Sequence, residues 1–111
     1  MDEDYALQVK KAVEMFERAA RLAYGDEIVT LVLFDSHARG EARPTSDVDI
    51  AVVLKDIPNR TEVRNNLVET YIDVHALPVS LDEWEHPEHH TNPALIRTIK
   101  REGVVWPLAA R

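Results

Sequence analysis

The sequence predicts a mixed α/β (α+β) fold in which helices cover a small β-sheet. Three observations predict it: an amphipathic N-terminal segment, three short runs rich in β-branched residues, and turn or helical segments that separate these runs. A chain of 111 residues suits one hydrophobic core, so residues 1–111 are expected to form a single domain.

The first half of the chain alternates from helix to strand to loop to strand. Residues 4–24 carry apolar side chains at helical spacing, namely Val9, Val13, Phe16, Ala20 and Ala23. Gly25 is expected to end this helix, and the β-branched run 28–34 predicts a strand buried on both faces. Residues 35–46 break the pattern with polar residues, glycine and proline, and residues 47–54 predict a second strand.

The second half predicts two more helices and two more strands. Thr61 is expected to cap a short helix that ends near Glu69, and residues 70–77 predict a strand that Pro78 ends. Residues 81–91 predict a short helical turn and a loop. Asn92 is expected to cap a helix over 93–101, which Gly103 ends before a short strand over 104–106.

Composition and charge narrow the functional classes. There is no apolar run long enough to span a membrane and no signal-peptide pattern, and without cysteine there are no disulfides or thiolate metal sites. These features fit a cytoplasmic protein. The formal net charge of -7 argues against direct nucleic-acid binding and suits a partner with a basic surface.

Asp47 and Asp49 are the leading candidates for chemistry. Side chains two residues apart on a strand share a face, so the two carboxylates are expected to project side by side. Adjacent carboxylates repel each other, and a bound Mg²⁺ or Mn²⁺ relieves that repulsion because hard cations prefer oxygen ligands. The alternative is a strand face whose acids simply meet water, which is the commoner case for an isolated Asp-x-Asp pattern.

The loop before this pair carries groups that suit phosphate. Ser36 follows a buried strand and precedes a possible helical turn, so its hydroxyl and nearby N–H groups are candidates to bind phosphate oxygens. Arg39 offers a planar fork of donors for the same oxygens. The competing interpretations are a helix N-cap for Ser36 and a salt bridge with Glu41 for Arg39.

Taken together, Leu31-Val32-Leu33-Phe34-Asp35-Ser36-His37-Ala38-Arg39-Gly40 and Ser46-Asp47-Val48-Asp49-Ile50 resemble the signature of minimal nucleotidyltransferases of the DNA polymerase β superfamily. Asp73 matches the family's third acid in order and setting, and residues 92–103 resemble the tail of these proteins. The resemblance implies a polymerase β-type nucleotidyltransferase fold, with Asp47, Asp49 and Asp73 as catalytic metal ligands and Ser36, Arg39 and Asp35 at the nucleotide.

The resemblance also implies a reaction and a partner. A nucleoside monophosphate, AMP from ATP in the first instance, is expected to pass to a hydroxyl acceptor by a two-metal mechanism. Such minimal proteins are often paired with a four-helix HEPN protein, in which the nucleotidyltransferase acts as an antitoxin and can modify a tyrosine of its partner toxin. Assembly with itself or with such a partner is therefore expected.

One position departs from the family pattern. The usual glycine before the serine is Asp35 here, which brings a Cβ and a negative charge toward anionic phosphates. A second hypothesis follows, in which the fold is kept, catalysis is impaired, and the protein neutralises a partner by contact alone. An aminoglycoside-type enzyme is a third interpretation, but those usually carry an added helical domain.

Several histidines and two tryptophans are weaker candidates. His86, His89 and His90 form a cluster with Glu85 and Glu88 that is expected to be a solvated loop rather than a zinc site. His37 lies in the loop beside Ser36, and His75 shares the facing parity of Asp73 and is expected near the site. Trp84 and Trp106 are expected to pack in the protein or against a partner.

Overall fold

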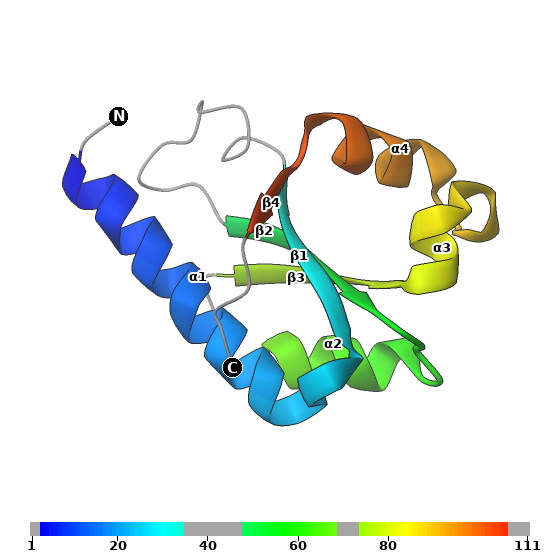
Figure 1. Ribbon diagram of the computed structural model, residues 1–111, viewed down its shortest axis with the longest axis horizontal. Coiled ribbons are helices and arrows are strands. Elements are labelled where there is room, and N and C mark those ends of the chain that lie inside the picture. The colour runs from blue at the N-terminus through cyan, green and yellow to red at the C-terminus, as the bar shows by residue number, and fades with distance from the viewer. Residues whose placement is uncertain (1–2, 35–47, 69–73, 107–111) are drawn as a thin grey trace.

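A computed structural model of the chain describes residues 3–34, 48–68 and 74–106. The elements follow one another as α1 (Glu3–Tyr24), η1 (Gly25–Glu27), β1 (Ile28–Phe34), β2 (Val48–Leu54), α2 (Arg60–Val68), β3 (Val74–Ser80), α3 (Leu81–Glu85), η2 (Pro87–His89), α4 (Pro93–Glu102) and β4 (Val104–Trp106). This order confirms the mixed α/β prediction, and Figure 1 shows helices on both sides of a central sheet. No helix within these ranges is long and apolar enough to cross a membrane.

The four strands form one sheet in the order β3-β2-β1-β4. Strand β1 pairs antiparallel with both β2 and β4, whereas β2 and β3 run parallel. A parallel pair needs a crossover, which the α2 helix provides. Strands β3 and β4 are therefore the two edges of the sheet within the described part of the chain.

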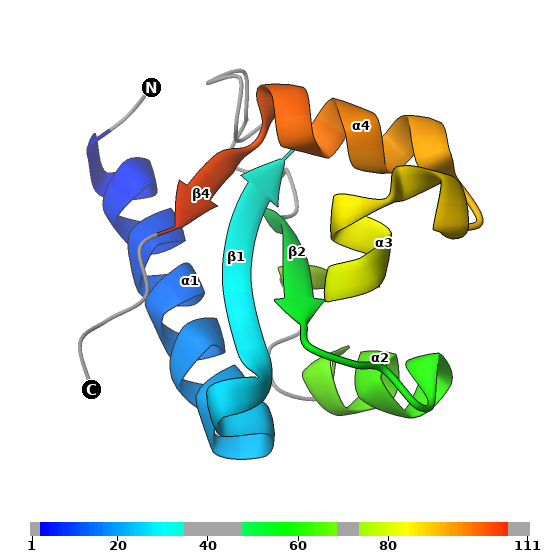
Figure 2. The ribbon, with the colours of Figure 1, turned by 45° about the vertical axis from the view of Figure 1, so that its right-hand side comes forward.

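Each face of the sheet has its own apolar cluster. On one face Val13, Phe16 and Ala20 of α1 pack with β-strand residues and with Val63 of α2. On the other, Ile96 and Ile99 of α4 pack with a second set of strand residues, namely Val32, Ala51, Val53 and Val79. Figure 2 shows α1 and α4 on opposite sides of β1 and β2. The alternation of side chains along each strand explains why consecutive residues join different clusters.

Two glycines end helices for different reasons. Gly25 has φ +51°, a left-handed conformation that other residues rarely adopt, and it follows α1 directly. Gly103 has an ordinary φ of -70°. A Cβ at Gly103 would overlap the Ile99 carbonyl oxygen and Cγ1 of Val32, so close approach of α4 to the sheet requires glycine here.

The structure corrects three details of the sequence prediction. Helix α2 begins at Arg60, and its cap is Asn59, whose side-chain oxygen accepts from the Glu62 N–H at 3.0 Å; Thr61 is not the cap. Strand β3 does not stop at Pro78 but continues to Ser80. Ala23, assigned to the buried stripe of the first helix, is exposed.

Pro78 is tolerated because β3 is an edge strand. Proline lacks an N–H, which matters only where the strand must donate to a neighbour. The Pro78 carbonyl oxygen accepts from Nη1 of Arg60 at 2.5 Å, so this residue faces away from β2. The prediction failed because it treated proline as a strand terminator without knowing which strand would lie at the edge.

Candidate functional site

Of the six predicted site residues, Asp49 lies in the described part of the chain. Asp35, Ser36, Arg39, Asp47 and Asp73 lie outside the described residues. Within the described residues, the candidate site consists of Asp49 and the side chains that surround it.

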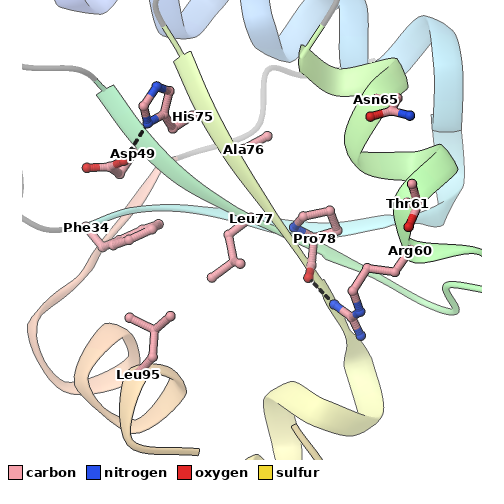
Figure 3. Close-up of a pocket in the computed structure, with 10 residues that line it drawn as sticks. All are labelled: Phe34, Asp49, Arg60, Thr61, Asn65, His75, Ala76, Leu77, Pro78 and Leu95. Carbon is pink, nitrogen blue, oxygen red and sulfur yellow. Dashed lines mark hydrogen bonds and ion pairs between the residues drawn. The ribbon is translucent and has the colours of Figure 1, made fainter. Parts of the chain in front are cut away.

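Asp49 is the second residue of β2 and is flanked by both neighbouring strands. It is the register partner of Phe34 on β1 and of His75 on β3. Its side chain is 20% exposed, and Nδ1 of His75 lies 3.7 Å from its Oδ1 (Figure 3). The sequence placed His75 near the site by parity, and the parallel register puts its ring next to this carboxylate.

The face of the sheet that carries Asp49 is the α4 face. Asp49 shares parity with Ala51 and Val53, whose side chains pack under α4. Phe34 and Leu77 also pack against that cluster, as does Leu95 of α4. An acidic group at the end of an apolar face is partly shielded from water, which strengthens its interaction with any cation that binds there.

A cavity of about 680 Å³ opens beside Asp49. Figure 3 shows that its walls come from strands β1, β2 and β3 and from helices α2 and α4. Its lining residues are Phe34, Asp49, Arg60, Thr61, Asn65, His75, Ala76, Leu77, Pro78 and Leu95. This volume is in the range of small-molecule and cofactor sites, which run to roughly 1,000 Å³.

Sequence reasoning missed most of the cavity walls. Arg60, Thr61 and Asn65 come from the crossover helix α2, and nothing in their local sequence indicates that α2 lies beside β3. For Leu77 a signal existed, because it shares parity with His75. Leu95 required knowledge of how α4 packs.

Arg60 connects three elements at the end of the cavity far from Asp49 along β3. Its guanidinium donates to the Pro78 carbonyl oxygen and to the carboxylate of Glu83. Glu83 also accepts from the Ser80 N–H, as part of a capping box that begins α3. Burial works against ionisation, yet the hydrogen bonds from Arg60 and Ser80 hold the pKa of Glu83 below its ordinary value.

The histidine-rich segment is not one solvated loop. His86 and His89 are exposed, with ring centroids 5.2 Å apart, and His89 Nδ1 lies 2.8 Å from Asp82 Oδ2. That contact raises the pKa of His89. His90, in contrast, is buried, and its Nδ1 accepts from the Asn92 N–H at 2.9 Å. The prediction that His90 lies in a solvated loop was wrong, because its buried ring accepts this hydrogen bond in the turn before α4.

The described residues can be compared with what a metal site requires, which is several ligands close together. They contain no group of three or more His, Asp or Glu side chains placed to hold a metal ion, which includes the His86 and His89 segment. The chemistry of Asp49 nevertheless fits a hard divalent cation, since it is a partly buried carboxylate that lines a cavity. The other carboxylates of the predicted set, Asp47 and Asp73, lie outside the described residues.

The tryptophans pack as structural residues. Trp84 of α3 packs against the cluster under α4, and Nζ of Lys100 lies 5.6 Å from its ring centroid. Trp106 of β4 packs against the cluster under α1. Neither residue lines the cavity beside Asp49.

The sequence is similar to that of a known protein family and of a curated relative. A family model described as "Polymerase beta, Nucleotidyltransferase" matches residues 17–106. A relative from Methanocaldococcus jannaschii, described as a "putative protein adenylyltransferase", is 32% identical over 60 residues. The alignment covers 54% of this chain and only 41% of that relative. A solved structure of a "putative nucleotidyltransferase" from Sulfolobus solfataricus covers 85% of this chain and 84% of its own, at 24% identity and a TM-score of 0.49.

Proposed function

The chain belongs to the polymerase β nucleotidyltransferase family, and on that premise we propose that it transfers AMP from ATP to a hydroxyl group of a protein. The observation that carries the proposal is Asp49, a partly buried carboxylate that lines a cavity, within the part of the chain that matches the family. The name of the Methanocaldococcus relative supports a protein acceptor.

The order of the chain supports a three-carboxylate centre. Asp47 precedes Val48, and Asp73 precedes Val74, while Val48 and Val74 are register partners. Each acid is thus joined by one peptide bond, with a Cα–Cα step of about 3.8 Å, to a residue of this pair, which lies at one end of β2 and β3. Asp49 is one residue further along the same end.

In the proposed reaction the hydroxyl oxygen of the acceptor forms a bond to the α-phosphorus, and the bridging bond to the β-phosphate breaks. Pyrophosphate leaves, and the hydroxyl proton passes to Asp73. Asp47, Asp49 and Asp73 would hold Mg²⁺ or Mn²⁺, which neutralises phosphate charge and activates the hydroxyl when bound. Ser36 and Arg39 would bind the triphosphate, and Asp35 would lie beside it.

We further propose that the acceptor belongs to a HEPN-type partner, with this protein as the antitoxin of the pair and acting in the cytoplasm. The support is the resemblance of residues 31–50 to minimal nucleotidyltransferases and a net charge of -7, which favours encounter with a basic surface.

The test uses labelled ATP, Mg²⁺ and the protein encoded beside this one. Wild type is expected to label the partner, and Asp49→Asn is expected to lose about a hundredfold or more in rate, because one metal ligand loses its charge. Asp56→Asn is the matched control. Asp56 is exposed beyond the other end of β2 and accepts from the Ile57 N–H through an oxygen that asparagine retains. Absence of ATP binding by the wild type in calorimetry would end the proposal.

The second candidate, a contact-only inhibitor of the partner, is favoured by Asp35 in place of glycine. It predicts partner neutralisation that survives Asp49→Asn. Replacing Asp35 with glycine distinguishes the two: a large gain in ATP affinity would show that Asp35 impairs nucleotide binding.

A further inference from the structure

The outer edge of β3 carries main-chain groups, and in the described part of the chain residues of α2 and α3 form hydrogen bonds with only some of them. Backbone N–H and C=O groups of successive strand residues point alternately to the two sides of a strand. The Pro78 carbonyl faces outward to Arg60, and the Ser80 N–H faces outward to Glu83. Even-numbered residues of β3 therefore direct their main-chain groups away from β2.

Going along β3 from Pro78 toward the end where Asp49 lies, Ala76 is the next residue whose main-chain groups point away from β2. Its side chain packs against the cluster under α1, and the residue lines the cavity beside Asp49. Within the described residues, no hydrogen bond is found for its N–H or C=O beyond the strand ladder. An open main-chain donor and acceptor on an edge strand form a template for another strand.

The cavity extends to both sides of this edge. On one side, Phe34, Leu77 and Leu95 form an apolar wall that leads to Asp49 and His75. On the other, Arg60, Thr61 and Asn65 of α2 form a polar wall (Figure 3). A strand laid along β3 alternates its side chains between two such walls, one apolar and one polar.

We propose that the acceptor is an extended polypeptide segment that pairs with β3 at Ala76 and presents a hydroxyl side chain beside Asp49. This inference rests on the proposed function, and it specifies how the acceptor is recognised. A peptide fits better than a small molecule, because the strand edge offers an N–H and a C=O with which another strand can pair. It fits better than nucleic acid, because the chain carries a net charge of -7.

The register sets which side chain receives the nucleotide. The hydroxyl-bearing residue must point to the apolar wall, since Asp49 lies on that face of the sheet. A residue two positions away points to the same wall and meets Leu77 or Leu95. The preferred acceptor therefore has a hydroxyl residue with an apolar residue two positions from it, and polar residues between them.

The first test changes the edge. Ala76→Pro removes the outward N–H without removing a donor to β2, and Pro78 shows that β3 accepts proline at this parity. Ala76→Gly keeps the N–H and is the matched control. The probe is a synthetic peptide of about nine residues with a central tyrosine and alternating valine and threonine, roughly 30 Å when extended. Ala76→Pro is expected to lower kcat/KM for peptide labelling about tenfold, the effect of one hydrogen bond, and Ala76→Gly by much less.

The second test changes the peptide and leaves the protein intact, so it does not depend on how Ala76→Pro folds. Two N-methylated versions carry methyl groups on alternate residues, one on each edge of the extended peptide. Methylation of the edge that faces β3 is expected to abolish labelling, whereas methylation of the opposite edge is expected to leave it within about twofold. Equal loss from both versions would overturn strand pairing.

The remaining outcomes separate the two proposals. ATP binding with transfer to small alcohols but never to peptides overturns the edge inference and leaves nucleotidyl transfer standing. Transfer to peptide that is unaffected by either test overturns it as well. A dimer in solution that Ala76→Pro dissociates would assign the edge to a second copy of this chain instead. Absence of ATP binding defeats the proposed function itself.

Discussion

Replacing glycine with alanine should lower the free energy of unfolding by very different amounts at the two helix ends, Gly25 and Gly103. Gly103→Ala introduces a Cβ that overlaps the Ile99 carbonyl oxygen and Cγ1 of Val32 and lies 3.1 Å from the Leu33 carbonyl oxygen. Gly25→Ala introduces a Cβ with no atom within 4 Å, but at φ +51°. The first change is a packing conflict, and the second is backbone strain without a packing conflict.

The magnitudes follow from these surroundings. Overpacking costs about 1–3 kcal/mol, and two of the three atoms near Gly103 are backbone oxygens that cannot rotate away. We therefore expect Gly103→Ala to lower the free energy of unfolding by about 3 kcal/mol. A left-handed alanine costs roughly 1 kcal/mol, which is the loss expected for Gly25→Ala. The difference between the two variants is a large part of a total free energy of unfolding of about 5–15 kcal/mol.

Urea unfolding followed by far-ultraviolet circular dichroism measures both values under one set of conditions. Gly103→Ala should also disturb the cavity beside Asp49, because Gly103 follows α4 and α4 carries Leu95. Gly25→Ala should not, since Gly25 follows α1 rather than α4. If Gly103→Ala costs no more than Gly25→Ala, the close approach of α4 to the sheet is not what requires glycine at position 103.

Two further predictions concern ionisable groups. A double-mutant cycle with Arg60→Met and Glu83→Gln should give a coupling of about 0.5–1 kcal/mol at neutral pH, discounted because Arg60 is partly exposed. Because the pKa of Glu83 is below 4.5, this coupling is present above that pH and is lost as pH falls through the lowered value; equal coupling at pH of about 3 and 7 would contradict the assignment. The hydrogen bond to Asp82 raises the pKa of His89 above 6.5, so its stabilising effect is present below that pH and is lost as pH rises through the raised value. Asp82→Asn should lower the pKa of His89 in an NMR titration, and an unchanged titration would show that the contact does not persist in solution.

Local sequence patterns were enough to predict most elements. The strands over Ile28–Phe34 and Val104–Trp106 match their predicted bounds, and the Asn92 side chain accepts from the Leu95 N–H at the start of α4 as expected. These features depend on residues close together in the chain. Thr61 was predicted as the α2 cap, but Asn59 has that role. Both residue types are good caps, and only the position of the helix start decides between them.

Errors occurred where distant residues decide the outcome. Pro78 continues a strand because β3 is an edge. Ala23 is exposed because it lies outside the buried face of α1, which includes Ala12, Val13, Phe16, Glu17 and Ala20. Glu17 is buried in α1 although its charge suggests a surface position, and Oε2 of Glu17 lies 3.4 Å from Nε of Arg21. The 3.6-residue period identifies a helix face, but the partner surface decides which residues at its borders are buried.

The candidate site depends most on a feature that no local pattern contains, the parallel pairing of β2 and β3. An antiparallel pair would direct the starts of the two strands to opposite ends of the sheet. The parallel pair places Asp49 opposite His75 and brings Val48 and Val74, the first residues of the two strands, to one end. The crossover that makes the pairing parallel is α2, and the same helix supplies the polar wall of the cavity. The same topology therefore sets both the position of Asp49 beside His75 and one wall of the cavity that Asp49 lines.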